Sequence, residues 1–90
     1  MPKISKSSTT PRFEKSFINL SLEIRTLAEK KIMLFESDFL HSSLRVHKLK
    51  GPLSDFWAFS IAKSYRVLFR FLKENEVIYY DIGPHDIYKK

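Results

Sequence analysis

The side chains of this sequence that could carry chemistry are histidines, arginines, lysines and tyrosines. His85 follows a Gly-Pro pair and precedes Tyr88 by three residues, and His47 stands directly before Lys48. A histidine titrates near neutral pH, so beside tyrosine and cationic side chains it could transfer protons during phosphodiester cleavage. An ordinary surface or loop histidine is the alternative interpretation of both positions. His41 lies in a polar segment and is expected only to be solvated.

Several other chemistries are excluded by residue type or spacing. The sequence has no cysteine, which excludes a thiol nucleophile, a disulfide and a cysteine-based zinc site. It has no His-x-x-x-His pair and no cluster of carboxylates, so we expect neither a metal nor another cofactor. Its two glycines, Gly51 and Gly83, cannot form a phosphate-binding glycine loop. The remaining residue types suit metal-independent RNA cleavage, in which the substrate's own 2′-hydroxyl is the nucleophile.

The charge of the chain indicates a polyanion or an acidic protein as its partner. The 90 residues carry a formal net charge of +6, and residues 1–45 and 46–90 each hold eight basic and five acidic side chains. The excess is therefore spread over the body of the protein, which is typical of domains that bind nucleic acid or acidic proteins. The alternative is an ordinary small basic domain.

Length and hydropathy predict one small domain. Residues 1–12 are polar and form either an arm or a weak edge strand over about 4–10, and residues 13–90 form the domain. The longest apolar run, 32–35, is far shorter than the ~18 residues of a membrane span, so no membrane contact is expected. The polar start has no signal-peptide pattern and the lack of cysteine suits a reducing compartment, so we expect a cytoplasmic protein.

Two helices are predicted after the polar start. Apolar residues recur at helical spacing from Phe13, which predicts a helix over about 13–20. Ser21 is a suitable N-cap for a second helix over about 22–37, where apolar residues again repeat every three or four positions. The two helices form a hairpin whose apolar side must be buried against another element.

Beyond residue 39 the apolar period changes to two, which predicts strands. Their expected ranges are 44–49, 57–61, 65–72 and 77–82. The short connections make these strands antiparallel neighbours. The fold class is therefore α+β, with an N-terminal helical hairpin packed on one face of a twisted antiparallel sheet of about four strands.

The third predicted strand places two arginines on the face away from the helices. Alternate residues from Tyr65 to Phe71 are apolar and suit the covered face. Arg66 and Arg70 then lie on the open face, roughly 13 Å apart along the strand. Arginines on an open sheet face are well suited to bind phosphate groups.

Four short stretches share their order and spacing with a known family. They are Leu-Arg-Val-His-Lys-Leu-Lys-Gly at 44–51, Trp-Ala-Phe-Ser-Ile at 57–61, Ser-Tyr-Arg-Val-Leu-Phe-Arg at 64–70 and Asp-Ile-Gly-Pro-His-Asp-Ile-Tyr at 81–88. Through them the chain resembles the RelE/ParE superfamily of bacterial toxin–antitoxin toxins, also called plasmid-stabilisation proteins. This resemblance implies a compact fold of two helices on a twisted antiparallel sheet.

The function that the resemblance implies depends on the branch of the superfamily. RelE-like members are endoribonucleases that mostly cut mRNA in the ribosomal A site, whereas ParE-like members inhibit DNA gyrase. The ending Gly-Pro-His-Asp-Ile-Tyr is more similar to the histidine-bearing ribonucleases, which include YafQ-like toxins. The sequence departs from those toxins at Ser60, where they carry a histidine, and at Lys63-Ser64, where they carry an acidic residue.

The resemblance also implies roles for individual residues. Arg66 matches the arginine that steadies the scissile phosphate, and His85 the group that protonates the leaving 5′-oxygen. His47 or Tyr88 would deprotonate the 2′-hydroxyl or stack on the base. Further RNA or phosphate contacts are expected from four more cations: Arg70, Lys48, Lys50 and Lys63.

Taken together, these residues predict the toxin of a type II toxin–antitoxin system, acting as a metal-independent endoribonuclease. Its expected partners are mRNA, the ribosome and a cognate antitoxin that covers the basic sheet face, without a small-molecule cofactor. Two alternatives stay open. One is a ParE-like, non-enzymatic inhibitor of DNA gyrase, and the other is a catalytically weak relative that only binds an antitoxin.

Overall fold

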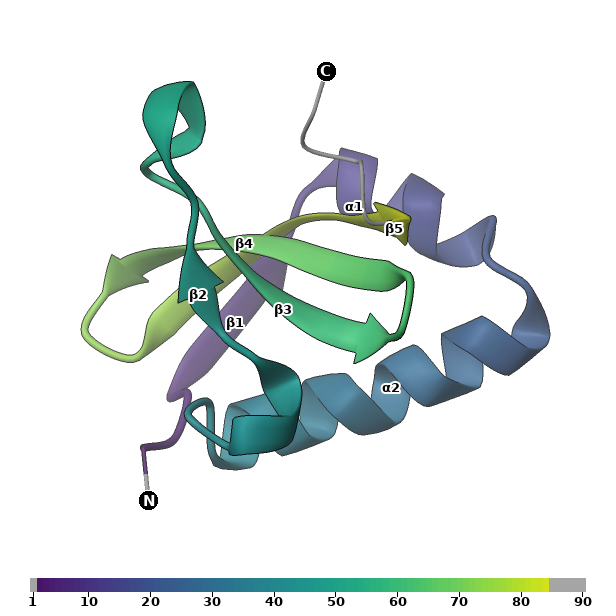
Figure 1. The fold of residues 1–90 in the computed structure, drawn as a ribbon, viewed down its shortest axis with the longest axis horizontal. Coiled ribbons are helices and arrows are strands. Elements are labelled where there is room, and N and C mark those ends of the chain that lie inside the picture. The colour runs from purple at the N-terminus through teal and green to yellow at the C-terminus, as the bar shows by residue number, and fades with distance from the viewer. Residues whose placement is uncertain (1, 85–90) are drawn as a thin grey trace.

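A five-stranded sheet with the order β1-β5-β4-β3-β2 forms the centre of the fold in this computed structural model, which describes residues 2–84 (Figure 1). The strands are β1 Lys6–Thr9, β2 His47–Lys48, β3 Trp57–Ala62, β4 Tyr65–Lys73 and β5 Glu76–Pro84. The helices are α1 Pro11–Ile18 and α2 Leu22–Ser37, and two short 3-10 turns flank β2, η1 Ser42–Leu44 and η2 Gly51–Leu53. The predicted α+β class is confirmed.

The sheet has five strands rather than the predicted four, because the N-terminal segment joins it. β2 to β5 form the expected antiparallel meander. β1 is an edge strand that runs parallel to β5, with Lys6 beside Glu76 and Thr9 beside Tyr79. Every side chain of β1 is exposed, so no apolar alternation marks this strand in the sequence.

Both helices begin at residues whose side chains cap them. The Thr10 hydroxyl accepts a hydrogen bond from the backbone N–H of Phe13 at 3.0 Å, and Pro11 follows it, so α1 begins earlier than predicted. The Ser21 hydroxyl accepts from the N–H of Ile24 at 3.3 Å, which confirms the predicted start of α2. In residues 2–84, neither helix has the length and apolar composition needed to cross a membrane.

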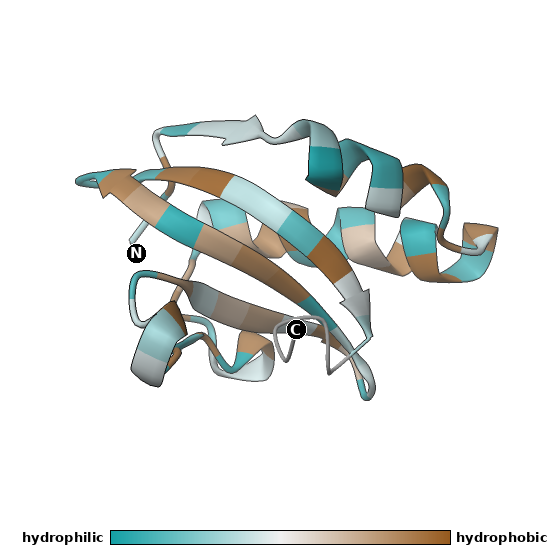
Figure 2. Cartoon of the chain, turned by 90° about the horizontal axis from the view of Figure 1, so that it is seen from above, coloured by the Kyte–Doolittle hydropathy of each residue, from teal (hydrophilic) through white to brown (hydrophobic). Residues whose placement is uncertain are grey.

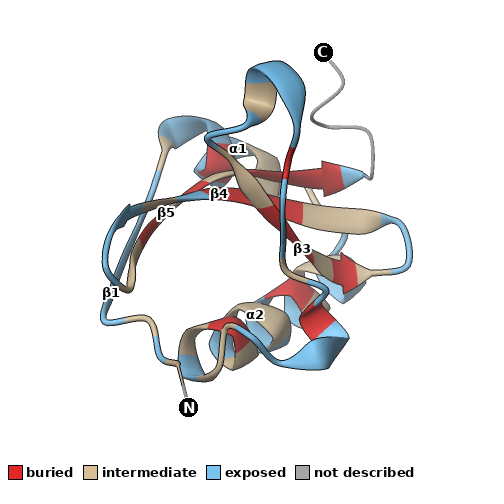
Figure 3. Ribbon diagram, turned by 60° about the vertical axis from the view of Figure 1, so that its left-hand side comes forward, coloured by how far each residue is buried: buried red, intermediate tan, exposed pale blue. Residues whose placement is uncertain are grey.

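Aromatic side chains fill the layer between the helices and the sheet. The Phe35 ring of α2 stacks on Phe59 of β3, with 4.3 Å between centroids, and meets Phe69 of β4 edge-on at 4.8 Å. Figure 3 shows buried residues in α2 and in β3, β4 and β5. The alternate residues of β4 from Tyr65 to Phe71 belong to this core, so the predicted covered face is confirmed.

The first predicted strand, 44–49, is largely wrong. Leu44 ends η1 with its side chain fully buried, and Arg45 adopts a left-handed backbone conformation with a φ of 53°. β2 is consequently reduced to His47–Lys48. Leu44 and Val46 pack in the core beneath the helices, whereas Leu49 is buried on the opposite face of the sheet, so the apolar residues of this segment do not belong to one regular strand.

The sheet face away from the helices is only partly open. Hydrophobic residues occupy consecutive positions of the strands (Figure 2), because this face carries a small core of its own. Leu49, Ala58 and Leu68 are buried there, and Phe56 and Tyr80 pack against them. The segment around η2 therefore covers the centre of this face and leaves its two ends accessible.

Candidate functional site

A cleft of about 330 Å³ opens beside the β3–β4 turn and gathers cations from distant parts of the chain. Among residues 2–84, its polar lining consists of four cationic side chains and two hydroxyls, without a carboxylate. These residues, which we call the basic pocket, are Lys31, Ser43, Arg45, Ser60, Lys63 and Arg66. Because like charges repel one another in a confined space, the pocket favours a bound anion.

The β3–β4 hairpin supplies half of the basic pocket. Lys63 lies in the turn, and Arg66 follows near the start of β4. Ser60 of β3 is directly opposite Arg66 in the antiparallel register. β2 pairs with β3 only as far as His47 beside Ala58, so the edge of β3 beyond this pair is not covered by β2. The pocket opens along that uncovered edge.

Lys31 of α2 and Arg45, which directly follows η1, complete the cationic lining of the pocket. The conformation of η1 is held by His41, whose Nδ1 accepts a hydrogen bond from the N–H of Ser43 at 3.2 Å. His41 is thus a capping residue and not merely a solvated one. Sequence periodicity does not indicate that Lys31 or Arg45 lies near Arg66, since this depends on how α2 and η1 pack on β3.

The guanidinium of Arg66 is held close to the hairpin turn. Its Nη1 donates to the carbonyl oxygens of Ala62 at 3.4 Å and Tyr65 at 3.2 Å. Within residues 2–84, the one ion pair joins Arg12 to Asp81, so no described carboxylate neutralises Arg66. Its remaining N–H donors can therefore bind phosphate oxygens in the paired geometry that a guanidinium favours.

His47 lies on the same sheet face as Ser60 and Arg66. It pairs with Ala58, two residues before Ser60, and side chains two apart on a strand share a face. Its Nδ1 is 2.9 Å from the carbonyl oxygen of Arg45. A carbonyl oxygen can only accept, so Nδ1 carries the hydrogen and the neutral ring offers Nε2 as a proton acceptor.

The other predicted phosphate contacts are dispersed. Lys48 pairs with Trp57, whose side chain packs on the helix side of the sheet. Lys48 therefore lies on the other face of the sheet from His47. Lys50 is exposed just before η2, and Arg70 is exposed further along β4. Lys63, the fourth predicted phosphate contact, does line the basic pocket.

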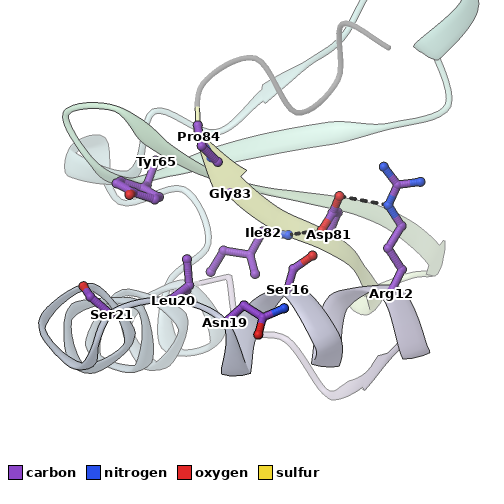
Figure 4. A pocket seen from close by; sticks show the side chains of 10 residues that line it. All are labelled: Arg12, Ser16, Asn19, Leu20, Ser21, Tyr65, Asp81, Ile82, Gly83 and Pro84. Carbon is purple, nitrogen blue, oxygen red and sulfur yellow. Dashed lines mark hydrogen bonds and ion pairs between the residues drawn. The ribbon is translucent and has the colours of Figure 1, made fainter.

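His85 and Tyr88 lie outside the described residues, and β5 ends at Pro84, directly before His85. A second cleft, of about 500 Å³, lies beside this end of β5 (Figure 4). In it, Nε of Arg12 donates to Oδ2 of Asp81 at 2.9 Å. The hydrogen bond and the charge of Asp81 raise the pKa of Arg12. This pair fixes the end of β5 to α1 just before the predicted catalytic segment.

Comparison with known proteins links the chain to others by structure. No family model matches the sequence, and no curated protein matches it. The RelE–RelB complex from the archaeon Pyrococcus horikoshii aligns with a TM-score of 0.71 at 15% identity, over 97% of this chain and 99% of that chain. The YoeB/ParE toxin from Agrobacterium tumefaciens aligns with a TM-score of 0.73 at 13% identity, over 89% and 98%.

YafQ from E. coli is also similar, with a TM-score of 0.68 at 12% identity, over 87% of this chain and 90% of that chain. These three alignments include nearly the whole of each compared chain, although few residues are identical. The likeness therefore extends beyond the short stretches of 44–88 to the arrangement of helices and strands. The chain has the fold of the RelE, YoeB/ParE and YafQ toxins.

Proposed function

We propose that this protein is the toxin of a type II toxin–antitoxin system and cleaves ribosome-associated mRNA as a metal-independent endoribonuclease. The observation that carries this proposal is the basic pocket. In it four cations meet, with no carboxylate from the described part of the chain in the lining, on a fold shared with RelE and YafQ toxins. A phosphodiester gains negative charge in the transition state of its cleavage. Cations held in place before the reaction stabilise that charge.

In the proposed reaction the scissile phosphate binds at Arg66, with Lys63 beside it. Nε2 of His47 accepts the proton of the 2′-hydroxyl while the 2′-oxygen attacks phosphorus. His85 donates a proton to the 5′-oxygen as its bond to phosphorus breaks, and Tyr88 stacks on a base. The products are a 2′,3′-cyclic phosphate and a 5′-hydroxyl. Each proton removed from the substrate is thus matched by one that is returned.

A cognate antitoxin is the second proposed partner. The similar archaeal structure is a complex of RelE with RelB, and we propose a corresponding complex for this chain. An acidic or amphipathic segment suits a protein with a formal net charge of +6. Bound over the sheet face that carries Arg66, it would exclude RNA from the basic pocket. Both proposed partners place the protein in the cytoplasm.

The proposal can be tested by primer extension on a reporter mRNA after induced expression in a bacterial host. Wild type is compared with Arg66→Ala, His85→Ala and the control Lys30→Ala, which removes an exposed cation of α2 outside the pocket. We expect discrete cuts with wild type and control, and cleavage reduced by about 10²-fold or more in the two site variants.

Two other results would reject the ribonuclease. Growth arrest with intact mRNA would indicate an inhibitor of another target, such as DNA gyrase. Expression without growth arrest would indicate a relative that only binds an antitoxin. Cleavage that persists in Arg66→Ala would show that the reaction takes place elsewhere on the protein.

A further inference from the structure

The sheet face away from the helices carries a second group of cations, in which two arginines cover two aromatic rings. The guanidinium carbon of Arg12 is 5.3 Å from the centroid of the Tyr80 ring. Tyr80 contacts Phe56, with 4.9 Å between the ring centroids. The guanidinium carbon of Arg70 is 5.7 Å from the centroid of Phe56. These four residues form what we call the arginine–aromatic cluster.

A β-bulge in β5 makes the cluster possible. Two consecutive residues of β4 pair with Asp81 and Tyr79, which leaves Tyr80 as the extra residue between them. The ring of Tyr80 packs against the small core around Leu68 and is therefore fixed in position. Asp81, next to it, is buried and accepts the hydrogen bond from Nε of Arg12. The bulge thus places the ring of Tyr80 and the carboxylate of Asp81 where both contact the guanidinium of Arg12.

Both guanidinium groups have donors left for a ligand. Arg12 donates to Asp81 through Nε, and its side chain is still 51% exposed. Arg70 is exposed, and it has no ion pair within residues 2–84. A guanidinium that already packs on a ring loses less conformational freedom on binding a phosphate than a free lysine would. Its outward face can also stack on a nucleobase.

We propose that the arginine–aromatic cluster binds the single-stranded RNA that flanks the cleaved bond, an inference that rests on the proposed function. Arg66 and Arg70 lie on the same face of β4, four residues and roughly 13 Å apart along the strand. An RNA strand with one phosphate at Arg66 would pass over the side chains that cover Leu68 to reach Arg70, and would continue from there along the two rings to Arg12. The cluster extends the substrate-binding surface from one phosphate to several nucleotides.

RNA fits this surface better than an acidic peptide does. A carboxylate uses only the edge of a guanidinium, whereas a nucleotide uses the edge through its phosphate and the flat face through its base. The cluster and the pocket at Arg66 lie at the two accessible ends of one sheet face, which suits a polymer with regularly spaced phosphates. An acidic peptide bound here would have no comparable reason to follow that path.

The test measures binding of the full chain to a fluorescent single-stranded RNA whose 2′-hydroxyls are methylated, so that cleavage cannot occur. Affinities of wild type, Arg70→Ala, Arg70→Lys and the control Lys30→Ala are compared over a range of salt concentrations. We expect Arg70→Ala to weaken binding and to lower the slope of log K against log salt by about 0.7, as for one lost phosphate contact on a single strand. Arg70→Lys keeps the slope but binds more weakly, since it cannot stack.

The control Lys30→Ala is expected to bind as wild type does. Arg12→Gln, which keeps a hydrogen-bond donor for Asp81, is expected to weaken binding in the same way as Arg70→Ala. Unchanged affinity in both Arg70→Ala and Arg12→Gln would overturn the proposal. So would a polyglutamate peptide of equal charge that binds as tightly as RNA with the same dependence on Arg70.

Failure of this inference and failure of the proposed function give different results. Cleavage that requires Arg66, together with RNA binding that is insensitive to Arg70, would reject the cluster and leave the ribonuclease in place. RNA binding that depends on Arg70, in a protein that cleaves no RNA, would reject the ribonuclease and support the cluster as an RNA-binding surface.

Discussion

The reactivity of His47 depends on the backbone of the residue two positions before it. The carbonyl oxygen of Arg45 accepts the hydrogen of Nδ1, which leaves Nε2 of His47 as the basic nitrogen. The same Arg45 places its own side chain at the basic pocket. The left-handed conformation of one residue therefore sets both the proton acceptor and one cation of the proposed site.

The role of His47 is tested by His47→Asn. The asparagine amide can still donate a hydrogen bond to the carbonyl of Arg45, but it has no group in the position of Nε2. We expect the single-turnover rate of RNA cleavage to fall by about 10²–10⁴-fold, the usual contribution of a positioned base. The melting temperature should stay close to that of wild type. A rate equal to the wild-type rate would remove His47 from the mechanism.

At the scale of elements, the sequence predicts those parts in which apolar side chains recur with a regular period. The bounds of α2 follow from its apolar period and the Ser21 cap, and β3, β4 and β5 follow from their period of two. β1 lacks such a period because all of its side chains are exposed. The bulge at Tyr80 also escapes prediction, since an extra residue breaks the alternation without a glycine to mark it.

A partly buried side-chain hydrogen bond joins β5 to α2. The hydroxyl of Tyr79 donates to Oε2 of Glu36 at 2.5 Å. Burial, and then the hydrogen bond and charge of Glu36, raise the pKa of Tyr79 above its ordinary value of 10.0. Ionisation of Tyr79 would place a second negative charge beside the carboxylate of Glu36.

This hydrogen bond predicts a loss of stability in alkaline solution. The pKa of Tyr79 is higher in the folded protein than in the unfolded protein, where it is about 10. The contribution of Tyr79 to the unfolding free energy is therefore complete below about pH 10 and is lost as the pH rises further. Urea unfolding is measured for wild type and Tyr79→Phe from about pH 9 to 11. The unfolding free energy of wild type should fall more steeply, by up to about 1.4 kcal/mol per pH unit. Parallel profiles would contradict the prediction.

At the scale of the whole molecule, the basic pocket exists only when α2, η1 and the β3–β4 hairpin are assembled. Arg66 and Lys63 are near neighbours in the sequence, and the sequence predicts both as phosphate contacts. Lys31 and Arg45 lie on other elements, and their approach is a product of tertiary packing. A single sequence contains no local pattern for such an approach, so this half of the pocket could not be predicted.

A ligand that binds only the assembled pocket must stabilise the folded protein. Inorganic pyrophosphate at about 100 times its dissociation constant should add about 2.7 kcal/mol to the unfolding free energy and raise the melting temperature. At the same pyrophosphate concentration, the increase in melting temperature should be smaller in Lys31→Ala, which removes a lining cation, than in Lys30→Ala, which removes its exposed neighbour on α2. Equal increases in the two variants would show that pyrophosphate binds elsewhere.

The parallel pairing of β1 with β5 has a consequence for the order of events during synthesis. Lys6 pairs with Glu76 and Thr9 with Tyr79, so β1 has no strand partner until β5 has left the ribosome. Contacts between residues so distant in sequence form slowly, because a long loop must close first. Translation of β5 is therefore the step that completes the sheet, and until then β1 has no strand to pair with.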